Sequence, residues 1–201
     1  MSGVKENKKP EVIVFAGPNG SGKSSVTSFL NPPQFLYINA DNIKRTMQYT
    51  DLQAAEEAEK MRERAIAERK DFSFETVLST DRNLKLLIKA KNAGYFVRCY
   101  YVLTVDPIIN ISRIESRVRA GGHDVPSEKI IKRYYRALDL VHELIPVCDV
   151  CHIYDNSQDK PYRIFKKRKS ECWYYTLENY WRKSDIELLT GIHDMKSGIS
   201  P

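Results

Sequence analysis

The feature that most constrains the fold is a short glycine-rich segment between a hydrophobic run and a helical pattern. The hydrophobic run Glu11 to Ala16 is typical of a buried strand, and a helix is predicted over Lys23 to Leu30. The connecting segment fits the pattern G-x-x-x-x-G-K-[ST] and consists of Gly17, Pro18, Asn19, Gly20, Ser21, Gly22, Lys23 and Ser24. A parallel sheet built around a phosphate site is therefore expected.

The chemistry of this segment predicts a nucleotide with Mg²⁺. Glycines let backbone N–H groups curl around phosphate oxygens, and the following helix N-terminus adds partial positive charge. Lys23 is expected to neutralise the β- and γ-phosphates, and Ser24 to give its hydroxyl to Mg²⁺. A glycine-rich turn without a ligand is the alternative, and the specificity of the pattern argues against it.

Composition and length favour one globular domain over residues 1–201. The chain of 201 residues is 42% hydrophobic and 29% charged, which excludes disordered, fibrous and disulfide-stapled classes. A net charge of +6 favours anionic partners. Apolar runs fall short of the ~20 residues of a spanning helix, and Met1 to Pro10 lacks the apolar region of a signal peptide. We expect a cytoplasmic protein without a membrane partner.

Apolar runs alternate with helical patterns, which is typical of βαβ units. We predict an α/β fold, a P-loop NTPase or kinase-like three-layer sandwich with a five-stranded, mainly parallel sheet. The expected strands are Glu11 to Ala16, Phe35 to Asn39, Phe72 to Thr76, Phe96 to Leu103 and Val147 to Tyr154. The expected helices after the first are Asn42 to Met47, Asp51 to Arg69, Arg82 to Ala93, one capped by Asp106 and Pro107, and Ser127 to Ile145.

The tail, residues 162–201, is basic and aromatic. We expect it to add an edge strand, a turn and a last helix to the same domain, with Gly198 to Pro201 frayed. Bases stacking on Trp173, Tyr175 and Trp181 would instead make the chain an ATP-gated nucleic-acid-binding protein. Anchoring of the tail by these aromatic residues is the favoured interpretation.

The four cysteines are expected to be reduced thiols that pack like small hydrophobic residues. Cys148, Cys151 and His152 spell C-x-x-C-H, a haem-attachment pattern. The pattern falls in the predicted strand Val147 to Tyr154, where positions three apart point to opposite faces. We therefore expect the two thiols to lie apart and to hold neither haem nor metal.

Two carboxylates are expected beside the glycine-rich loop, at the carboxyl ends of strands. Asp41 follows the second strand and can accept a proton from an alcohol, although it can also cap the next helix. Glu75 and Thr76 end the third strand, where Glu75 is a candidate ligand for a substrate hydroxyl. A solvated surface carboxylate is the alternative for Glu75.

Basic residues form a predicted helical lid over about residues 113–136. Two helical stripes flank a breaking loop, residues 121–126, and arginines delivered by a closing lid would stabilise a transferring phosphoryl group. Each arginine alone also fits a solvated surface. After the fifth strand, Asn156 lies where a nucleotide base or ribose can rest, and a simple turn is the alternative.

These motifs together resemble the small zeta-toxin-like branch of P-loop kinases. The resemblance spans roughly Val12 to Ser157 and rests on GPNGSGKSS, YINAD, FETVLS, GGHDVP with a following RYYR, and YDNS. It implies a bacterial kinase that uses ATP and Mg²⁺ to phosphorylate a sugar nucleotide such as UDP-N-acetylglucosamine, with an antitoxin protein as partner. Nucleic acid is not an expected partner.

The resemblance also implies roles for individual residues. Asp41 would be the catalytic base, and Glu75 and Thr76 would meet the substrate. The loop from Gly17 to Ser25 would bind ATP, with Ser24 on the metal. The lid arginines would be Arg117 and Arg133 in catalysis and Arg119 and Arg136 in nucleotide binding, together with Asn156.

Overall fold

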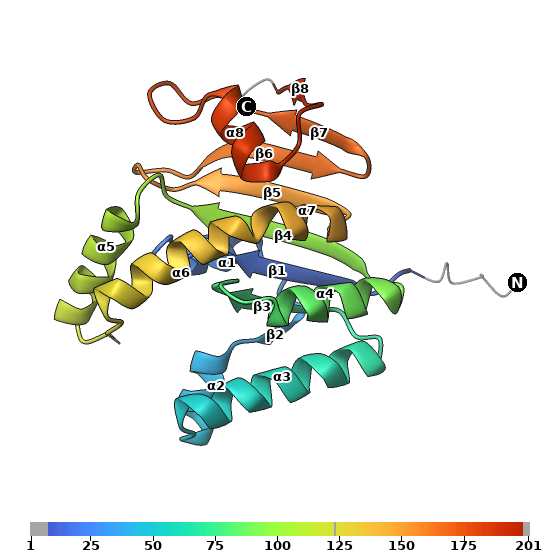
Figure 1. The fold of residues 1–201 in the computed structure, drawn as a ribbon. Helices are drawn as coiled ribbons and strands as arrows, with labels where there is room; N and C mark the ends of the chain where they lie inside the picture. The colour runs from blue at the N-terminus through green and yellow to red at the C-terminus, as the bar shows by residue number, and fades with distance from the viewer. Residues whose placement is uncertain (1–7, 123, 199–201) are drawn as a thin grey trace, which may run out of the picture.

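The computed structural model describes residues 8–122 and 124–198, so His123 of the predicted lid loop and residues 199–201 of the predicted frayed end lie outside it. One sheet with helices on both faces makes up the described part (Figure 1). Its strands are β1 (Glu11–Ala16), β2 (Leu36–Ile38), β3 (Phe72–Thr76), β4 (Phe96–Leu103), β5 (Val150–Asp155), β6 (Tyr162–Arg168), β7 (Glu171–Tyr174) and β8 (Lys196–Ser197). Its helices are α1 (Lys23–Leu30), α2 (Ala40–Met47), α3 (Asp51–Ala67), α4 (Arg82–Asn92), α5 (Pro107–Arg119), α6 (Ser127–Asp139), α7 (Val141–Val147) and α8 (Lys183–Thr190).

The sheet places the carboxyl end of β1 at its centre. The strand order is β2-β3-β1-β4-β5-β6-β7-β8, and the first five of these strands run parallel. The chain leaves β1 toward β2 on one side, whereas β4 flanks β1 on the other side. Ligands of open α/β sheets bind at such a switch point, beyond the carboxyl ends of the strands.

Two separate cores explain why the sheet is covered on both faces. Alternate residues of β1 point to opposite sides: Val12 and Val14 pack in the larger core under α3, α4 and α7, whereas Ile13 and Phe15 pack in a smaller core with Val26 of α1. A strand buried on both faces is hydrophobic at nearly every position. The predicted three-layer α/β fold is confirmed.

The local patterns predicted several element boundaries correctly. The bounds of β1, β3, β4 and α1 are those expected from the sequence. The strand count is wrong: among the described residues the sheet has eight strands, because the tail contributes β6, β7 and β8 rather than a single edge strand. β6 and β7 are antiparallel hairpin partners, and the positive-φ turn residue Lys169 (φ 56°) connects them.

Two predicted helices are also corrected. The helix expected over Ser127 to Ile145 is broken at Leu140 into α6 and α7. Because of this break, Val141 and Leu144 of α7 pack into the larger core, whereas α6 lies against α5. α2 begins at Ala40, two residues earlier than expected.

The predicted separation of the cysteine thiols is wrong. β5 begins at Val150, so Cys148 lies before the strand, at the C-cap of α7, and the strand alternation does not apply to it. The sulfurs of Cys99, Cys148 and Cys151 lie within 4.8 Å of one another. All four cysteines are unpaired and buried.

The aromatic residues of the tail divide between core and surface. Trp181 and Tyr175 are 8% and 6% exposed, and the Trp181 indole donates to Asp155 Oδ2 at 2.8 Å. Trp173 is half-buried on the sheet surface, where Lys166 and Lys196 lie over its ring. Two of the three residues considered as stacking platforms for bases are therefore core residues, as the anchoring interpretation expects.

We propose that the tail and the β1 to β5 body form one cooperative unit. Trp181→Ala is expected to cost about 3–5 kcal/mol of unfolding free energy, as for other buried tryptophans, with a single thermal transition. Trp173→Ala is the matched control and should cost clearly less, because its ring is half-exposed. Calorimetry of both variants measures the loss of stability and the number of transitions. A separate low-temperature transition of the tail in Trp181→Ala would contradict a single unit.

Membrane insertion through a helix finds no support in the described part of the chain, since none of its helices combines the length and apolarity that a bilayer span requires.

Candidate active site

The glycine-rich loop occupies the end of β1 and approaches two neighbouring segments closely. Gly17 has φ 137°, and a Cβ there would lie 1.9 Å from the Val102 carbonyl oxygen. Gly20 has φ 76°, and a Cβ there would lie 2.5 Å from the Asn110 carbonyl oxygen. Glycine is required at both positions, because L side chains neither adopt these angles easily nor fit the space. The backbone is thereby folded into a tight turn before α1.

Lys23, the first residue of α1, turns its ammonium back over this loop. Its Nζ donates to the carbonyl oxygens of Gly17 and Pro18, both at 2.8 Å. Burial lowers the pKa of Lys23 to about 8, Glu75 opposes this shift, and Arg117 adds to it. A partly buried cation whose hydrogen bonds go to carbonyl oxygens is a strong attractor for a phosphate anion.

Ser24 and Glu75 form the polar wall next to the loop. Ser24 Oγ donates to Glu75 Oε2 at 3.1 Å, and Tyr37 Oη donates to Glu75 Oε1 at 2.8 Å. Asn39 Nδ2 in turn donates to Tyr37 Oη at 2.9 Å. Glu75 is therefore held in place by both oxygens and is not simply a solvated surface carboxylate. The hydroxyl and carboxylate oxygens together are ligands of the kind that Mg²⁺ prefers, so the residues fit that ion.

Asp41 lies in the first turn of α2 and is not its cap. Asn39 is the N-cap residue, and its side chain accepts from the backbone N–H groups of Asp41 and Asn42 at 2.8 and 3.2 Å. The alternative that Asp41 serves as the N-cap is therefore wrong. Since capping is done by Asn39, the Asp41 carboxylate is available to the cleft that it lines.

These side chains line one cleft of about 700 Å³. Loop residues, both predicted carboxylates and part of the lid contribute to its walls: Asn19, Gly20, Gly22, Lys23, Ser24, Ser25, Asn39, Ala40, Asp41, Glu75, Thr76, Val77, Arg113, Ile114, Arg117, Gly122 and Val125. Cations and carboxylates both line it. The arrangement suits an anionic ligand beside a group from which a proton is removed.

The predicted lid arginines do not all reach the cleft. Arg117 lines it, and Arg133 Nη1 lies 3.5 Å from Asn19 Oδ1 at its edge. Arg119 is exposed and donates to Ser116 Oγ on its own helix at 3.0 Å, and Arg136 is exposed on α6. Neither Arg119 nor Arg136 belongs to the cleft lining. The structure thus brings together only part of the predicted arginine set.

Two further predicted residues support the loop. Thr76 Oγ1 accepts from Leu78 N at 3.0 Å and Asn83 Nδ2 at 2.8 Å, and its carbonyl accepts from Gly17 N. Asn156 Nδ2 donates to the Ser21 carbonyl at 2.8 Å. Both residues therefore fix the position of the loop, whatever else they contact.

Two residues of the site, Tyr37 and Asn39, are absent from the functional candidates that the sequence predicts, whereas Arg113 belongs to the predicted lid. Tyr37 and Asn39 orient Glu75. The sequence signal for them is their spacing: they are two residues apart at the end of β2, so their side chains point to the same face. Arg113, one turn before Arg117, lines the cleft, and its Nη1 is buried with no hydrogen-bond partner among the described residues. This guanidinium nitrogen is therefore free to donate to an anion bound in the cleft.

Comparisons with known proteins identify the family of the chain. A family model described as zeta toxin matches residues 31–169. An uncharacterized protein of Haemophilus influenzae is 31% identical over 137 residues, which are 66% of this chain and 95% of that protein. The glycine-rich loop lies just before the stretch that the family model matches.

Solved structures share the fold. A chain of the PezAT chromosomal toxin–antitoxin system of Streptococcus pneumoniae matches with a TM-score of 0.55 and 19% identity, over 79% of this chain and 74% of that one. AvrRxo1-ORF1:-ORF2 with ATP matches with a TM-score of 0.70 and 11% identity, over 96% and 67%. The protein belongs to the zeta toxin family and has the α/β fold of P-loop kinases.

Proposed function

We propose that this protein is a kinase that transfers the γ-phosphoryl group of ATP to a hydroxyl group of a small molecule. The observation that carries the proposal is one cleft that is lined by the glycine-rich loop, Lys23 and the carboxylates Asp41 and Glu75. A phosphate cradle alone also fits switches and motors. A carboxylate opposite the cradle is what an alcohol acceptor needs.

ATP and Mg²⁺ are the proposed cofactors, and the residues present fit both. Ser21 Oγ in the loop and Arg113 Nη1 in the cleft are buried polar atoms without partners in the described part of the chain, as expected of groups that await a ligand. Ser24 would hold the metal ion beside Glu75. When bound, Mg²⁺ neutralises charge on the phosphate oxygens.

Residues of the chain have separate roles in the proposed reaction. Asp41 accepts the proton of the acceptor hydroxyl, and Lys23 holds the phosphates. Arg117 and Arg113 from α5, with Arg133 from α6, stabilise charge on the transferring group and exclude water when the lid closes. Glu75 and Thr76 meet the substrate, with Tyr37 holding Glu75 in place.

A sugar nucleotide is the proposed acceptor, and UDP-N-acetylglucosamine is the first one to test. The test is transfer of labelled γ-phosphate from ATP to this acceptor by the wild-type protein beside Lys23→Ala. Label in the sugar nucleotide with the wild type alone supports the proposed acceptor. Absence of label from the acceptor, with ATP binding intact, would exclude this acceptor.

We further propose an antitoxin protein as a partner in the bacterial cytoplasm. The support is family membership and the likeness in fold to chains of toxin–antitoxin complexes. Co-purification from the native host, with Arg119→Ala as a surface control, tests for such a partner.

The protein should take up a proton when it binds the nucleotide near pH 8. Free Lys23 loses its charge as the pH rises through about 8, and phosphate oxygens next to the ammonium raise that pKa again. ATP affinity is therefore expected to fall above pH 8. Calorimetry in buffers of different ionisation enthalpy measures the proton uptake, and Lys23→Met should abolish it. Equal uptake in the wild type and Lys23→Met would show that another group takes up the proton.

A further inference from the structure

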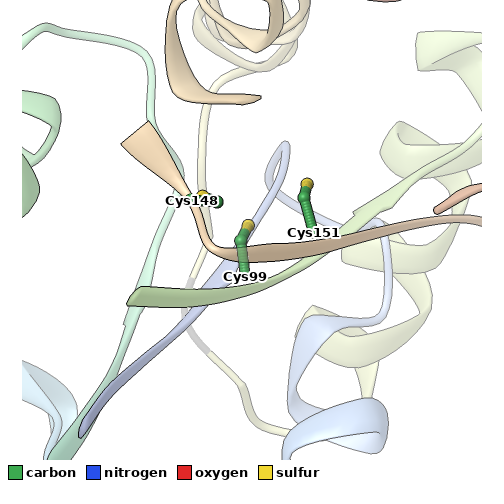
Figure 2. A group of neighbouring side chains, drawn as sticks. All are labelled: Cys99, Cys148 and Cys151. Atoms are coloured by element: carbon green, nitrogen blue, oxygen red, sulfur yellow. The ribbon is translucent and has the colours of Figure 1, made fainter. Parts of the chain in front are cut away.

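Three cysteines from separate elements converge beside the start of β5. Cys99 of β4 and Cys151 of β5 are register partners on neighbouring parallel strands, and Cys148 lies at the end of α7 (Figure 2). Their sulfurs all lie within 4.8 Å of one another. Each residue is at most 1% exposed. The proposed kinase reaction uses none of them.

The spacing of the sulfurs suits one small ion. Metal–sulfur bonds of about 2.3 Å in a planar trigonal arrangement place sulfurs about 4.0 Å apart. Sulfurs already within 4.8 Å reach that spacing through small side-chain movements. Cys172, the fourth buried cysteine, lies outside this group and shows that burial alone does not bring the thiols together.

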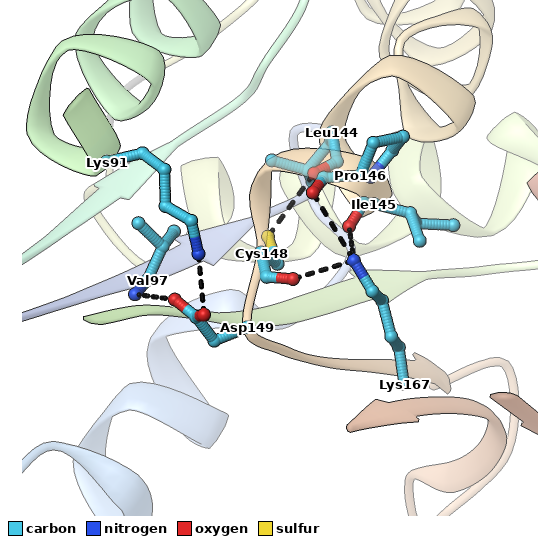
Figure 3. A network of polar contacts seen from close by, with 8 residues as sticks. All are labelled: Lys91, Val97, Leu144, Ile145, Pro146, Cys148, Asp149 and Lys167. Atoms are coloured by element: carbon cyan, nitrogen blue, oxygen red, sulfur yellow. Dashed lines mark hydrogen bonds and ion pairs between the residues drawn. The ribbon is translucent and has the colours of Figure 1, made fainter. Parts of the chain in front are cut away.

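A cation lies beside the cluster. Lys167 Nζ donates to the carbonyl oxygens of Ile145 and Cys148, both at 2.8 Å, and to that of Pro146 at 3.3 Å (Figure 3). These carbonyls end α7, whose negative dipole end would otherwise repel thiolates. Lys167 therefore places a positive charge next to the three sulfurs.

The cluster offers three ligands and no fourth from its neighbours. Asp149 accepts from Lys91 Nζ at 2.5 Å and from Val97 N at 2.8 Å, so both of its oxygens are engaged (Figure 3). His152 follows Cys151 and points to the opposite face of the sheet, where it stacks on Tyr100. The cluster itself is closed to solvent. Zn²⁺, which takes four ligands, is thereby disfavoured.

We propose that Cys99, Cys148 and Cys151 form a buried, three-coordinate binding site for a thiophilic monovalent ion, Cu(I). Thiolates select this ion, and it is stable with fewer ligands than Zn²⁺ takes. Binding releases the thiol protons, and three thiolates with Cu(I) carry two net negative charges, one of which Lys167 offsets. The bound ion ties β4 and β5 to α7.

Copper titration under anaerobic, reducing conditions tests the site. The full-length protein is refolded with Cu(I) in the presence of a competing Cu(I) chelator, because the folded cluster is closed to solvent. One copper per chain is expected, with a higher thermal midpoint. Cys148→Ala should lower the affinity at least tenfold, whereas the matched control Cys172→Ala should bind like the wild type.

X-ray absorption on the copper-loaded wild type tests the ligand set independently of any variant. Three sulfur neighbours are expected. Three results would each overturn the site. They are complete removal of the copper by the chelator, nitrogen or oxygen atoms around the copper, and binding of copper by Cys148→Ala as tight as by the wild type. None of these outcomes affects the proposed kinase, which depends on other residues.

Discussion

Replacing Asp41 with asparagine is expected to lower phosphoryl transfer by a factor of about 10² to 10⁴, the usual contribution of a positioned general base. ATP binding should be unchanged, because Lys23 and the glycine-rich loop hold the phosphates. The helix should also remain intact, since Asn39 and not Asp41 caps α2. Single-turnover transfer and nucleotide titration separate these effects.

The matched control for Asp41→Asn is Glu56→Gln, which removes a negative charge from an exposed position on α3 outside the cleft lining. This variant should retain the wild-type rate. If Asp41→Asn also retains it, the base is another group. If Asp41→Asn loses ATP binding together with transfer, Asp41 acts on the nucleotide and not on the acceptor.

Arg117→Ala is expected to lower transfer by about 10³, as is typical when an arginine that stabilises a transferring phosphoryl group is removed. Both arginines are exposed, but only Arg117 lines the cleft, whereas Arg119, two residues further along α5, contacts Ser116 on its own helix. The effect should appear in the rate of transfer at saturating ATP, because charge on the transferring group peaks in the transition state.

Arg119→Ala supplies the comparison, since it removes the same charge from the same helix. It should stay close to the wild type in rate and in ATP affinity. Equal losses in the two variants would point to the overall charge of the lid. A loss in Arg119→Ala alone would restore the sequence prediction that Arg119 binds the nucleotide.

Local patterns in the sequence were sufficient to predict the central part of the fold. The hydrophobic run of β1, the glycine-rich loop and the start of α1 follow from adjacent residues, so their bounds were predicted correctly. The cleft carboxylates could also be predicted, because Asp41 follows β2 and Glu75 lies at the end of β3, and the carboxyl ends of these strands meet at one edge.

Contacts between distant segments could not be predicted in the same way. The hydrogen bond from Tyr37 to Glu75 joins residues 38 apart, and the one from Trp181 to Asp155 closes the tail onto β5. The cysteine cluster depends on where β5 begins: a start at Val150 rather than Val147 moves Cys148 off the strand and toward Cys99. A shift of three residues thus changed the predicted chemistry.

The most direct test of the kinase proposal is incubation of the wild-type protein and Asp41→Asn with γ-labelled ATP, Mg²⁺ and a bacterial metabolite extract. The account predicts a labelled small molecule, heavier than its precursor by one phosphoryl group, that forms with the wild type and not with Asp41→Asn. Label that remains in ATP or appears only as inorganic phosphate, with ATP bound normally, would contradict it.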